Sequence, residues 1–155
     1  MNHSLTALKR KIPGFNKREQ TVEDFWRIVR REGIYVQFWK LRKGTKGFYG
    51  LNRRHKKPVK YIVINQDTIN DDWLLTAFHE LMHHFLHAPF STQEVYFSNH
   101  KKKSREDREA ERFARMMIIP KPVLLELMHT PFEEIIGYPR ELLIARKRDF
   151  EIYGE

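Results

Sequence analysis

One stretch of the chain, residues 73–87, constrains the fold strongly because it combines many apolar residues with four histidines and a glutamate. The apolar residues recur at helical spacing and cover most of the cylinder, which predicts a central, buried helix. Asn70 or Asp71 can cap its start, Asp71 and Asp72 suit the positive end of the helix dipole, and Pro89 ends the segment. We therefore expect a helix here, with the rest of the chain packed around it.

Within this helix, the segment from His79 to His83 has the pattern H-E-x-x-H. Residues four apart lie on one face of a helix, so the two imidazoles can bind a single ion. Zinc is the usual ion for two imidazoles, and a catalytic zinc takes three protein ligands and a water. Glu80 would lie beside the metal, where it can take a proton from that water. The pattern predicts a hydrolase site with a Lewis acid, a nucleophilic water and a general base.

The alternative is a pair of histidines that hydrogen-bond within the core. Two histidines and a glutamate on so apolar a helix would be costly to bury without partners, and a metal supplies them.

The third ligand must come from another part of the chain, and since there is no cysteine, a carboxylate on the next helix is the obvious source. Residues 104–119 predict that helix, because apolar residues recur there at helical spacing and Pro120 stops it. Ala110 is small and would let this helix approach the first one closely. The acidic candidates around it are Glu106, Asp107, Glu109 and Glu111.

Other polar residues near the motif have weaker indications. His87 lies two turns from His79, too far along a straight helix for all three imidazoles to bind one ion. We expect His87 to hydrogen-bond beside the site or to brace the helix end. Tyr96 or His100 could stabilise the oxyanion of a tetrahedral intermediate, and the alternative is that both are loop residues without a catalytic role.

The composition indicates a globular protein of one domain, since the chain has 155 residues of which 41% are hydrophobic. The absence of cysteine excludes disulfides, a thiolate metal site and a cysteine nucleophile. There is no stretch like a signal peptide and none near the ~18 to 20 apolar residues that cross a bilayer. We expect a cytoplasmic protein without a membrane partner.

The formal net charge is +9, with basic clusters at residues 9–11, 53–57 and 101–103. Such clusters could contact nucleic acid or an acidic protein, or they could be solvated loops that keep the protein soluble. No helix-turn-helix, zinc-finger or RNA-binding signature accompanies them. The charge alone therefore leaves a nucleic-acid contact possible but unproven.

The remaining segments predict an α+β architecture, with a small, mostly antiparallel sheet of about three strands and several helices. Residues 1–20 are expected to form a flexible basic arm, and residues 88–103 an irregular loop that could lie over the site. The predicted strands are residues 34–39, a short strand around 48–49, and 59–64, the last antiparallel to its neighbours. The other predicted helices are residues 21–33, 122–129 and 141–153, the first with a capping box of Thr21 and Asp24.

The two spaced motifs resemble the ImmA/IrrE metallopeptidases. His79 to His83 with Leu86-His87 matches the family's H-E-L-G-H-x-x-L-H, and the run from Asp107 to Pro120 matches its E-x-x-A-[ND]-x-F-A-x-x-L-L-M-P. The resemblance covers roughly residues 21–125 and implies a zincin-like fold, with residues 21–155 as the metallopeptidase domain.

The resemblance also implies a zinc site with Asp107 as the third ligand and Glu80 as the catalytic base. The family has glutamate where this chain has Asp107, and glycine where it has Met82. An aspartate is one methylene shorter, so the helices must sit closer or another carboxylate must bind. Asp107 could instead cap its helix in a box with Ser104.

The resemblance implies site-specific cleavage of a regulatory protein, commonly a helix-turn-helix repressor of a mobile element or stress response that is encoded nearby. The alternative is a non-catalytic module that keeps the zincin fold and acts by binding a protein partner or DNA.

Overall fold

The computed structural model describes residues 3–69, 73–98 and 104–155, in which six α-helices and a four-stranded sheet confirm the predicted α+β class. The chain divides into two compact units, one formed by residues 21–114 and the other by residues 3–20 together with 115–155. The elements are α1 (His3–Lys11), α2 (Val22–Glu32), β1 (Ile34–Trp39), β2 (Gly47–Asn52), β3 (Val59–Asn65), η1 (Gln66–Thr68), α3 (Trp73–Leu86), η2 (Ala88–Phe90), β4 (Val95–Phe97), α4 (Arg105–Ile118), α5 (Lys121–Leu127), η3 (Phe132–Glu134) and α6 (Arg140–Tyr153).

The sheet lies wholly in the unit of residues 21–114 and has the strand order β1-β3-β2-β4. Strand β3 pairs antiparallel with β2, as predicted, but parallel with β1, where the prediction is wrong. The sheet is mostly antiparallel, as predicted, and has four strands rather than about three. Four successive buried residues, 62–65, suit β3 to the centre of the sheet. Strands β1 and β2 run in opposite directions. Strand β3 is antiparallel to β2, so it runs in the same direction as β1, which it pairs with on its other edge.

The fourth strand falls in the segment that we predicted to be an irregular loop. Within its described part, the short helix η2 is followed by β4, which pairs antiparallel with β2 through Leu51 and Tyr96. Three residues are too few for an alternating pattern to stand out in the sequence. Only the pairing with β2 makes this segment a strand. The predicted site residue His100 lies outside the described residues.

Helix α2 begins and ends as its sequence predicts. Thr21 accepts a hydrogen bond from the backbone amide of Asp24, and the Asp24 side chain accepts one from Thr21, which completes the capping box. Gly33 ends the helix in the left-handed conformation, with φ of 66°.

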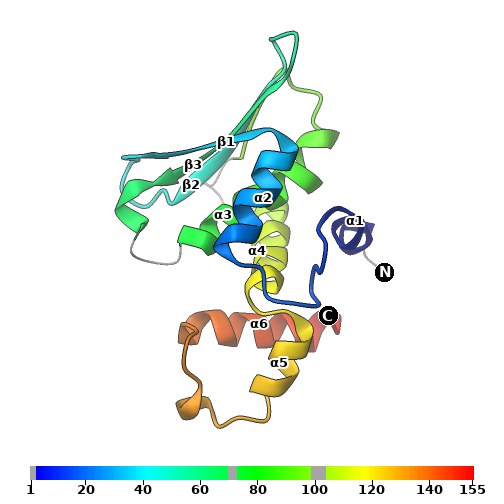
Figure 1. Cartoon of the computed structure of the whole chain (residues 1–155), viewed down its shortest axis with the longest axis vertical. Coiled ribbons are helices and arrows are strands. Elements are labelled where there is room, and N and C mark those ends of the chain that lie inside the picture. Colours follow the sequence, from blue (N-terminus) through cyan, green and yellow to red (C-terminus); the bar gives the residue numbers. More distant parts are fainter. Residues whose placement is uncertain (1–2, 70–72, 99–103) are drawn as a thin grey trace. The chain divides into compact units, whose positions relative to one another are not determined.

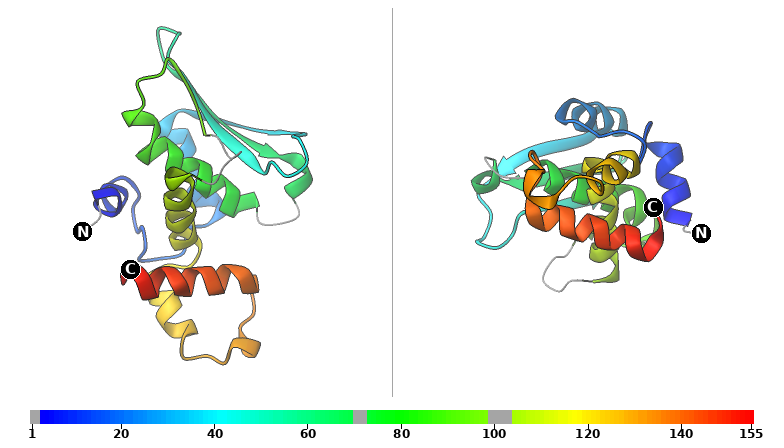
Figure 2. Two further views of the ribbon diagram at one scale, coloured as in Figure 1. Left: turned by 180° about the vertical axis from the view of Figure 1, so that it is seen from behind. Right: turned by 90° about the horizontal axis from the view of Figure 1, so that it is seen from below.

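Helices α2 and α3 lie on the same side of the sheet (Figures 1 and 2). Phe25 of α2 contacts Phe78 of α3, with ring centroids 5.9 Å apart, and both rings are fully buried. Phe38 of β1 reaches Trp73, and Tyr49 of β2 reaches His84, so these strand residues also face the helices. Full burial of a ring such as that of Phe78 contributes about 1.5–3 kcal/mol, which helps to hold α3 against the sheet.

The other predicted helices are confirmed within one or two residues at each end, the usual uncertainty of a helix boundary. Helix α3 ends at Leu86 rather than residue 87, and α4 spans 105–118 rather than 104–119. The predicted N-terminal caps of α3, Asn70 and Asp71, lie outside the described residues.

The N-terminal segment forms a helix that its sequence does not predict, α1, which buries Leu5 and Leu8. With Ile12, which is also buried, these leucines make an apolar helix face that the surrounding lysines and arginines obscure in the sequence. That residues 1–20 form a flexible basic arm stays a prediction. That residues 21–155 form a domain without them stays a prediction.

Candidate metal centre

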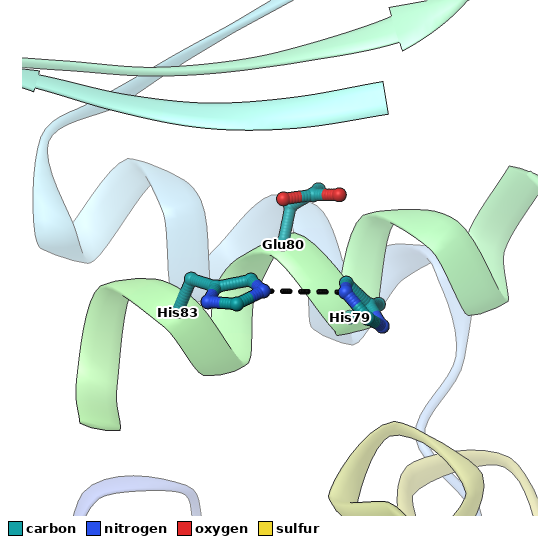
Figure 3. Close-up of side chains that lie close together, drawn as sticks. All are labelled: His79, Glu80 and His83. Carbon is teal, nitrogen blue, oxygen red and sulfur yellow. Dashed lines mark hydrogen bonds between the residues drawn. The ribbon is translucent and has the colours of Figure 1, made fainter. Parts of the chain in front are cut away.

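Helix α3 places His79 and His83 one turn apart, and their Nε2 atoms are 3.2 Å from one another (Figure 3). His83 is buried, while His79 is partly exposed. Since both imidazoles turn the same ring nitrogen toward one point, they could offer that nitrogen to a single ion.

Asp107, from the first turn of α4, lies at the same point. Its Oδ1 atom is 3.3 Å from Nε2 of His83 and 3.7 Å from Nε2 of His79, and the carboxylate is almost fully buried. Its Oδ2 atom accepts hydrogen bonds from the amide and hydroxyl of Ser104, at 3.2 and 3.0 Å. The Asp107 amide in turn donates to the Ser104 hydroxyl, which completes a capping box. One oxygen of Asp107 therefore caps its helix, while the other lies beside the two imidazoles.

The spacing of these three atoms fits one tetrahedral ion. With metal–ligand distances of about 2.0–2.2 Å, neighbouring ligand atoms in a tetrahedral zinc site are about 3.3–3.5 Å apart. The three separations here are 3.2, 3.3 and 3.7 Å. Two imidazoles and one carboxylate are also an established set of protein ligands for catalytic zinc.

Glu80 points from α3 toward the strands, on a different side of the helix from the facing imidazoles (Figure 3). One of its carboxylate oxygens is nevertheless within 4.8 Å of a ring nitrogen of both His79 and His83. The hydroxyl of Ser98 donates to Glu80 Oε2 at 2.7 Å, and the backbone amide of Tyr49 donates to the Ser98 oxygen at 2.8 Å. Glu80 is 1% exposed, so this chain of hydrogen bonds from the sheet fixes a buried carboxylate beside the histidines.

The second ring nitrogen of His83 contacts residues beside the site. His83 Nδ1 is 2.9 Å from Nδ1 of His87 and 3.4 Å from the hydroxyl of Tyr96. Nε2 of His87 lies 3.4 Å from a carboxylate oxygen of Glu109. Such outer contacts set which nitrogen of an imidazole carries the proton. His87 thus makes the kind of hydrogen bond that we expected of it.

Burial raises the pKa of Tyr96, and the negative charges of Glu106, Glu80 and Asp107 raise it further. Its phenol therefore stays protonated at neutral pH. The hydroxyl lies near the ring nitrogen of His83 that faces away from His79 and Asp107. A role for Tyr96 in stabilising an oxyanion stays a prediction.

The other acidic candidates on α4 are placed differently from Asp107. Glu106 is exposed and has a carboxylate oxygen within 4.8 Å of ring nitrogens of His83 and His87. Glu109 contacts His87, and Glu111 is half-buried.

His84 points away from the cluster. One of its ring nitrogens is 3.0 Å from the Tyr49 hydroxyl, and the other is 3.0 Å from a carboxylate oxygen of Glu32. Both nitrogens therefore have partners outside the candidate site.

Ser98 is the residue beside the site that the sequence does not single out. Serine is common in loops, and residue 98 follows a strand that the pattern does not predict. Ser98 is two residues after Tyr96, so on an extended chain both side chains point to the same side. Without knowing that residues 95–97 form a strand, the sequence does not indicate that Ser98 lies near the site.

Comparison with models of protein families matches residues 29–135 to the IrrE N-terminal-like domain, Peptidase M78. The match spans about two thirds of the chain and includes every residue of the cluster described above. Searches of curated proteins and of solved structures found no significant match. Within the described residues, none of the helices has the length and apolar character that crossing a membrane would require.

Proposed function

The chain belongs to the ImmA/IrrE family of metallopeptidases, and from that premise we propose that it cleaves a specific regulatory protein with a zinc ion held by His79, His83 and Asp107. The observation that carries the proposal is the convergence of two Nε2 atoms and one Oδ1 atom at separations of 3.2–3.7 Å. The family supports a metallopeptidase with a protein substrate. The zinc ion, its ligands and the substrate are proposed here.

The ion, when bound, polarises the scissile carbonyl and acidifies the attacking water. Glu80 is the general base that takes a proton from this water and then gives it to the leaving amine. Its hydrogen bond from Ser98 holds the carboxylate in one orientation during both transfers. Ser98 is therefore a positioning residue that acts through Glu80.

The neighbours of His83 support its use of Nε2 toward the ion. With Nε2 unprotonated, Nδ1 carries the proton and can donate to Nδ1 of His87 at 2.9 Å. His87 then carries its own proton on Nε2, where Glu109 lies 3.4 Å away. In this order each of the two imidazoles donates its one proton to the next group, Glu109 accepts the last hydrogen bond, and the basicity of the His83 imidazole rises.

A helix-turn-helix repressor encoded beside the gene is the proposed substrate, because family members commonly act on such repressors. The proposal is tested with the full chain, the Glu80→Gln and His79→Ala variants, and the purified repressor. Bound metal is measured by elemental analysis and cleavage by mass spectrometry. We expect Glu80→Gln to retain its metal and lose cleavage, and His79→Ala to lose both.

Glu111→Gln is the matched control, since it removes a charge from the same helix as Asp107 and should leave both measurements unchanged. Loss of metal in this variant would assign the third ligand to Glu111 instead. Full cleavage by Glu80→Gln would refute the mechanism. If the metal-loaded wild type leaves the repressor intact, the choice of substrate is wrong while the metal assignment stands.

A non-catalytic regulatory module is the competing function, and it makes the opposite prediction in cells. A module that acts by binding would still relieve repression when it carries Glu80→Gln. A catalytic protease would not.

A further inference from the structure

The face of the sheet opposite α2 and α3 carries exposed aromatic side chains. Tyr35 is 67% exposed, Trp39 48% and Phe97 50%. Phe38 and Tyr49 face the helices, so their sequence neighbours on β1 and β2 face the other way. Among the described residues of 21–114, no α-helix covers this second face (Figure 1). It lies on the other side of the sheet from the metal centre.

The aromatic residues line up across all four strands. Tyr35 of β1 is opposite Tyr61 of β3, Tyr61 is opposite Gly50 of β2, and Gly50 is opposite Phe97 of β4. Residues opposite one another share a face, so one row runs across the full width of the sheet.

Gly50 makes this row continuous, because its missing side chain leaves room for the Tyr61 ring. A Cβ atom at Gly50 would collide with that ring. Tyr61 therefore lies across β2 and reaches Phe97, with ring centroids 6.3 Å apart, while Phe48 lies 6.2 Å from each of the two. These contacts hold three rings in a fixed cluster before any partner binds.

The net charge of the chain is concentrated in the segment that forms β1, β2 and β3. Residues 34–66 contain nine lysines and arginines and no aspartate or glutamate. The other 20 basic residues of the chain equal its 20 acidic residues, so this segment accounts for the whole net charge of +9. The nine basic residues are Lys40, Arg42, Lys43, Lys46, Arg53, Arg54, Lys56, Lys57 and Lys60.

Eight of these nine residues lie in the two loops that join the strands, at opposite ends of the sheet. The loop between β1 and β2 contains Lys40 to Lys46, and the loop between β2 and β3 contains Arg53 to Lys57. The second loop is anchored on the β4 side, since Arg53 donates to the backbone oxygens of Gln93 and Ala88. Positive charge therefore lies on both sides of the row of rings, at the two ends of the strands that the row crosses.

We propose that this face binds single-stranded nucleic acid. Every base offers a flat surface that stacks on exposed aromatic rings, and the phosphates between bases are attracted to lysine and arginine. An acidic protein would be attracted by the charge, but it has no flat group on every residue to stack along the row, as a nucleic acid has on every nucleotide. Duplex DNA buries its bases, so it could contact the basic loops without stacking on the aromatic row.

The test measures binding of a labelled oligonucleotide of roughly 20 mixed nucleotides, long enough for a site of about 4–16 nucleotides. The full chain carries Glu80→Gln in all samples, so that proteolysis cannot affect the result. Single-stranded DNA, single-stranded RNA, duplex DNA and polyglutamate are compared by fluorescence anisotropy over a range of salt concentrations. We expect both single strands to bind more tightly than the duplex or polyglutamate, and the ratio of RNA to DNA affinity identifies the natural source.

Stacking and charge are tested with separate variants, and stacking is tested first. Tyr35→Ala and Trp39→Ala should each weaken binding at least about fivefold, whereas Trp39→Phe should retain most of the affinity. Phe90→Ala, at an 82% exposed aromatic outside the sheet, is the matched control and should have no effect.

The charge is tested by Arg42→Gln combined with Lys43→Gln. This double variant should reduce the slope of log affinity against log salt by about 0.7 for each phosphate that the protein no longer neutralises. Lys147→Gln with Arg148→Gln on α6, which belongs to the other compact unit, removes the same net charge and should leave the slope unchanged.

The proposal would be overturned if duplex and single strand bound with equal affinity and neither Tyr35→Ala nor Trp39→Ala changed it. Binding would then be non-specific electrostatic attraction between the basic residues and phosphates. Equal or tighter binding of polyglutamate would overturn it in favour of an acidic protein. Because Tyr35 and Trp39 are largely exposed, both alanine variants should keep the wild-type unfolding temperature, which makes a loss of binding interpretable.

Discussion

Helices α2 and α4 begin with the same local structure. In α2, the amide and hydroxyl of Thr21 donate to Asp24 Oδ2 at 2.8 and 3.1 Å, and the Asp24 amide donates back to the hydroxyl at 3.2 Å. In α4, Ser104 and Asp107 make the same three hydrogen bonds, at 3.2, 3.0 and 3.1 Å. Both are capping boxes in which an aspartate takes the place of the more usual glutamate.

The second carboxylate oxygen has a different partner in each helix. Asp24 Oδ1 accepts from Arg27, one turn along α2, at 2.9 Å. Asp107 Oδ1 instead lies 3.3 and 3.7 Å from the facing nitrogens of two histidines on α3. A capping box therefore uses one oxygen and orients the other, and the element that packs against the helix decides what the second oxygen meets. Capping a helix and binding a metal are compatible roles for one aspartate.

The largest expected difference is between Asp107→Ala and Asp24→Ala. Both variants lose the carboxylate half of a capping box, the hydrogen bonds that Thr21 or Ser104 donates to it, which costs about 1 kcal/mol of folding free energy. If Asp107 is a metal ligand, its alanine variant should also lose metal affinity more than about 100-fold, beyond the usual effect of residues that only support a ligand. Competition with a chromophoric chelator measures the affinity. Equal affinities in the two variants would remove Asp107 from the metal site.

Removal of the metal should distinguish the same two variants by stability. At a free metal concentration of about 100 times the dissociation constant, binding stabilises the folded state by about 2.7 kcal/mol. The wild type and Asp24→Ala should lose this amount in excess chelator, while Asp107→Ala should change little. Chemical unfolding with and without metal gives the three values. A metal-dependent change of the same size in Asp107→Ala would show that the ion is held without this carboxylate.

Alanine variants of the two N-cap residues, Ser104 and Thr21, should differ in metal affinity by a smaller factor than the two aspartate variants. Ser104→Ala and Thr21→Ala should each destabilise the metal-free protein by about 1 kcal/mol. Ser104→Ala should additionally weaken metal binding by about tenfold, because Asp107 Oδ1 loses its fixed orientation. Ser104→Thr keeps the hydroxyl and should restore the affinity. An unchanged metal affinity in Ser104→Ala would mean that α4 orients Asp107 without the box.

The smallest effect is expected at Arg27, whose side chain is 71% exposed. An ion pair in this setting is screened by water, so Arg27→Ala should change the free energy of unfolding by less than about 0.5 kcal/mol, and by less still at high salt. Unfolding in urea at two salt concentrations measures this. A larger loss of unfolding free energy would mean that the contact between Arg27 and Asp24 Oδ1 stabilises the fold substantially.

Much of the site is readable from local spacing in the sequence. The pattern from His79 to His83 predicts two imidazoles on one face of a buried helix, and the structure has them at 3.2 Å. Both capping boxes are also readable, because the first and fourth residues of each are three positions apart. These features depend on the constant geometry of a helix.

The missed features depend on partners far away in the chain. The order of the strands places β3 beside β1 and parallel with it, and no strand sequence specifies that neighbour or its direction. Strand β4 and Ser98 escape notice because three residues give no periodicity and one serine gives no pattern. The helix α1 was missed for a different reason, since its short apolar face is surrounded by basic residues.

The sequence by itself determined which residues form the central helix, where helices α2 and α4 are capped, and which side chains of residues 79–83 share a face. These are short-range properties, set by the rise and turn of a helix and by residues three or four positions apart. Only the tertiary structure decided that Ser98 meets Glu80 and that Asp107, rather than another acid of its helix, lies 3.3 Å from His83. Those contacts join residues 18 or more positions apart, and their distances depend on how the helices and the sheet pack as a whole.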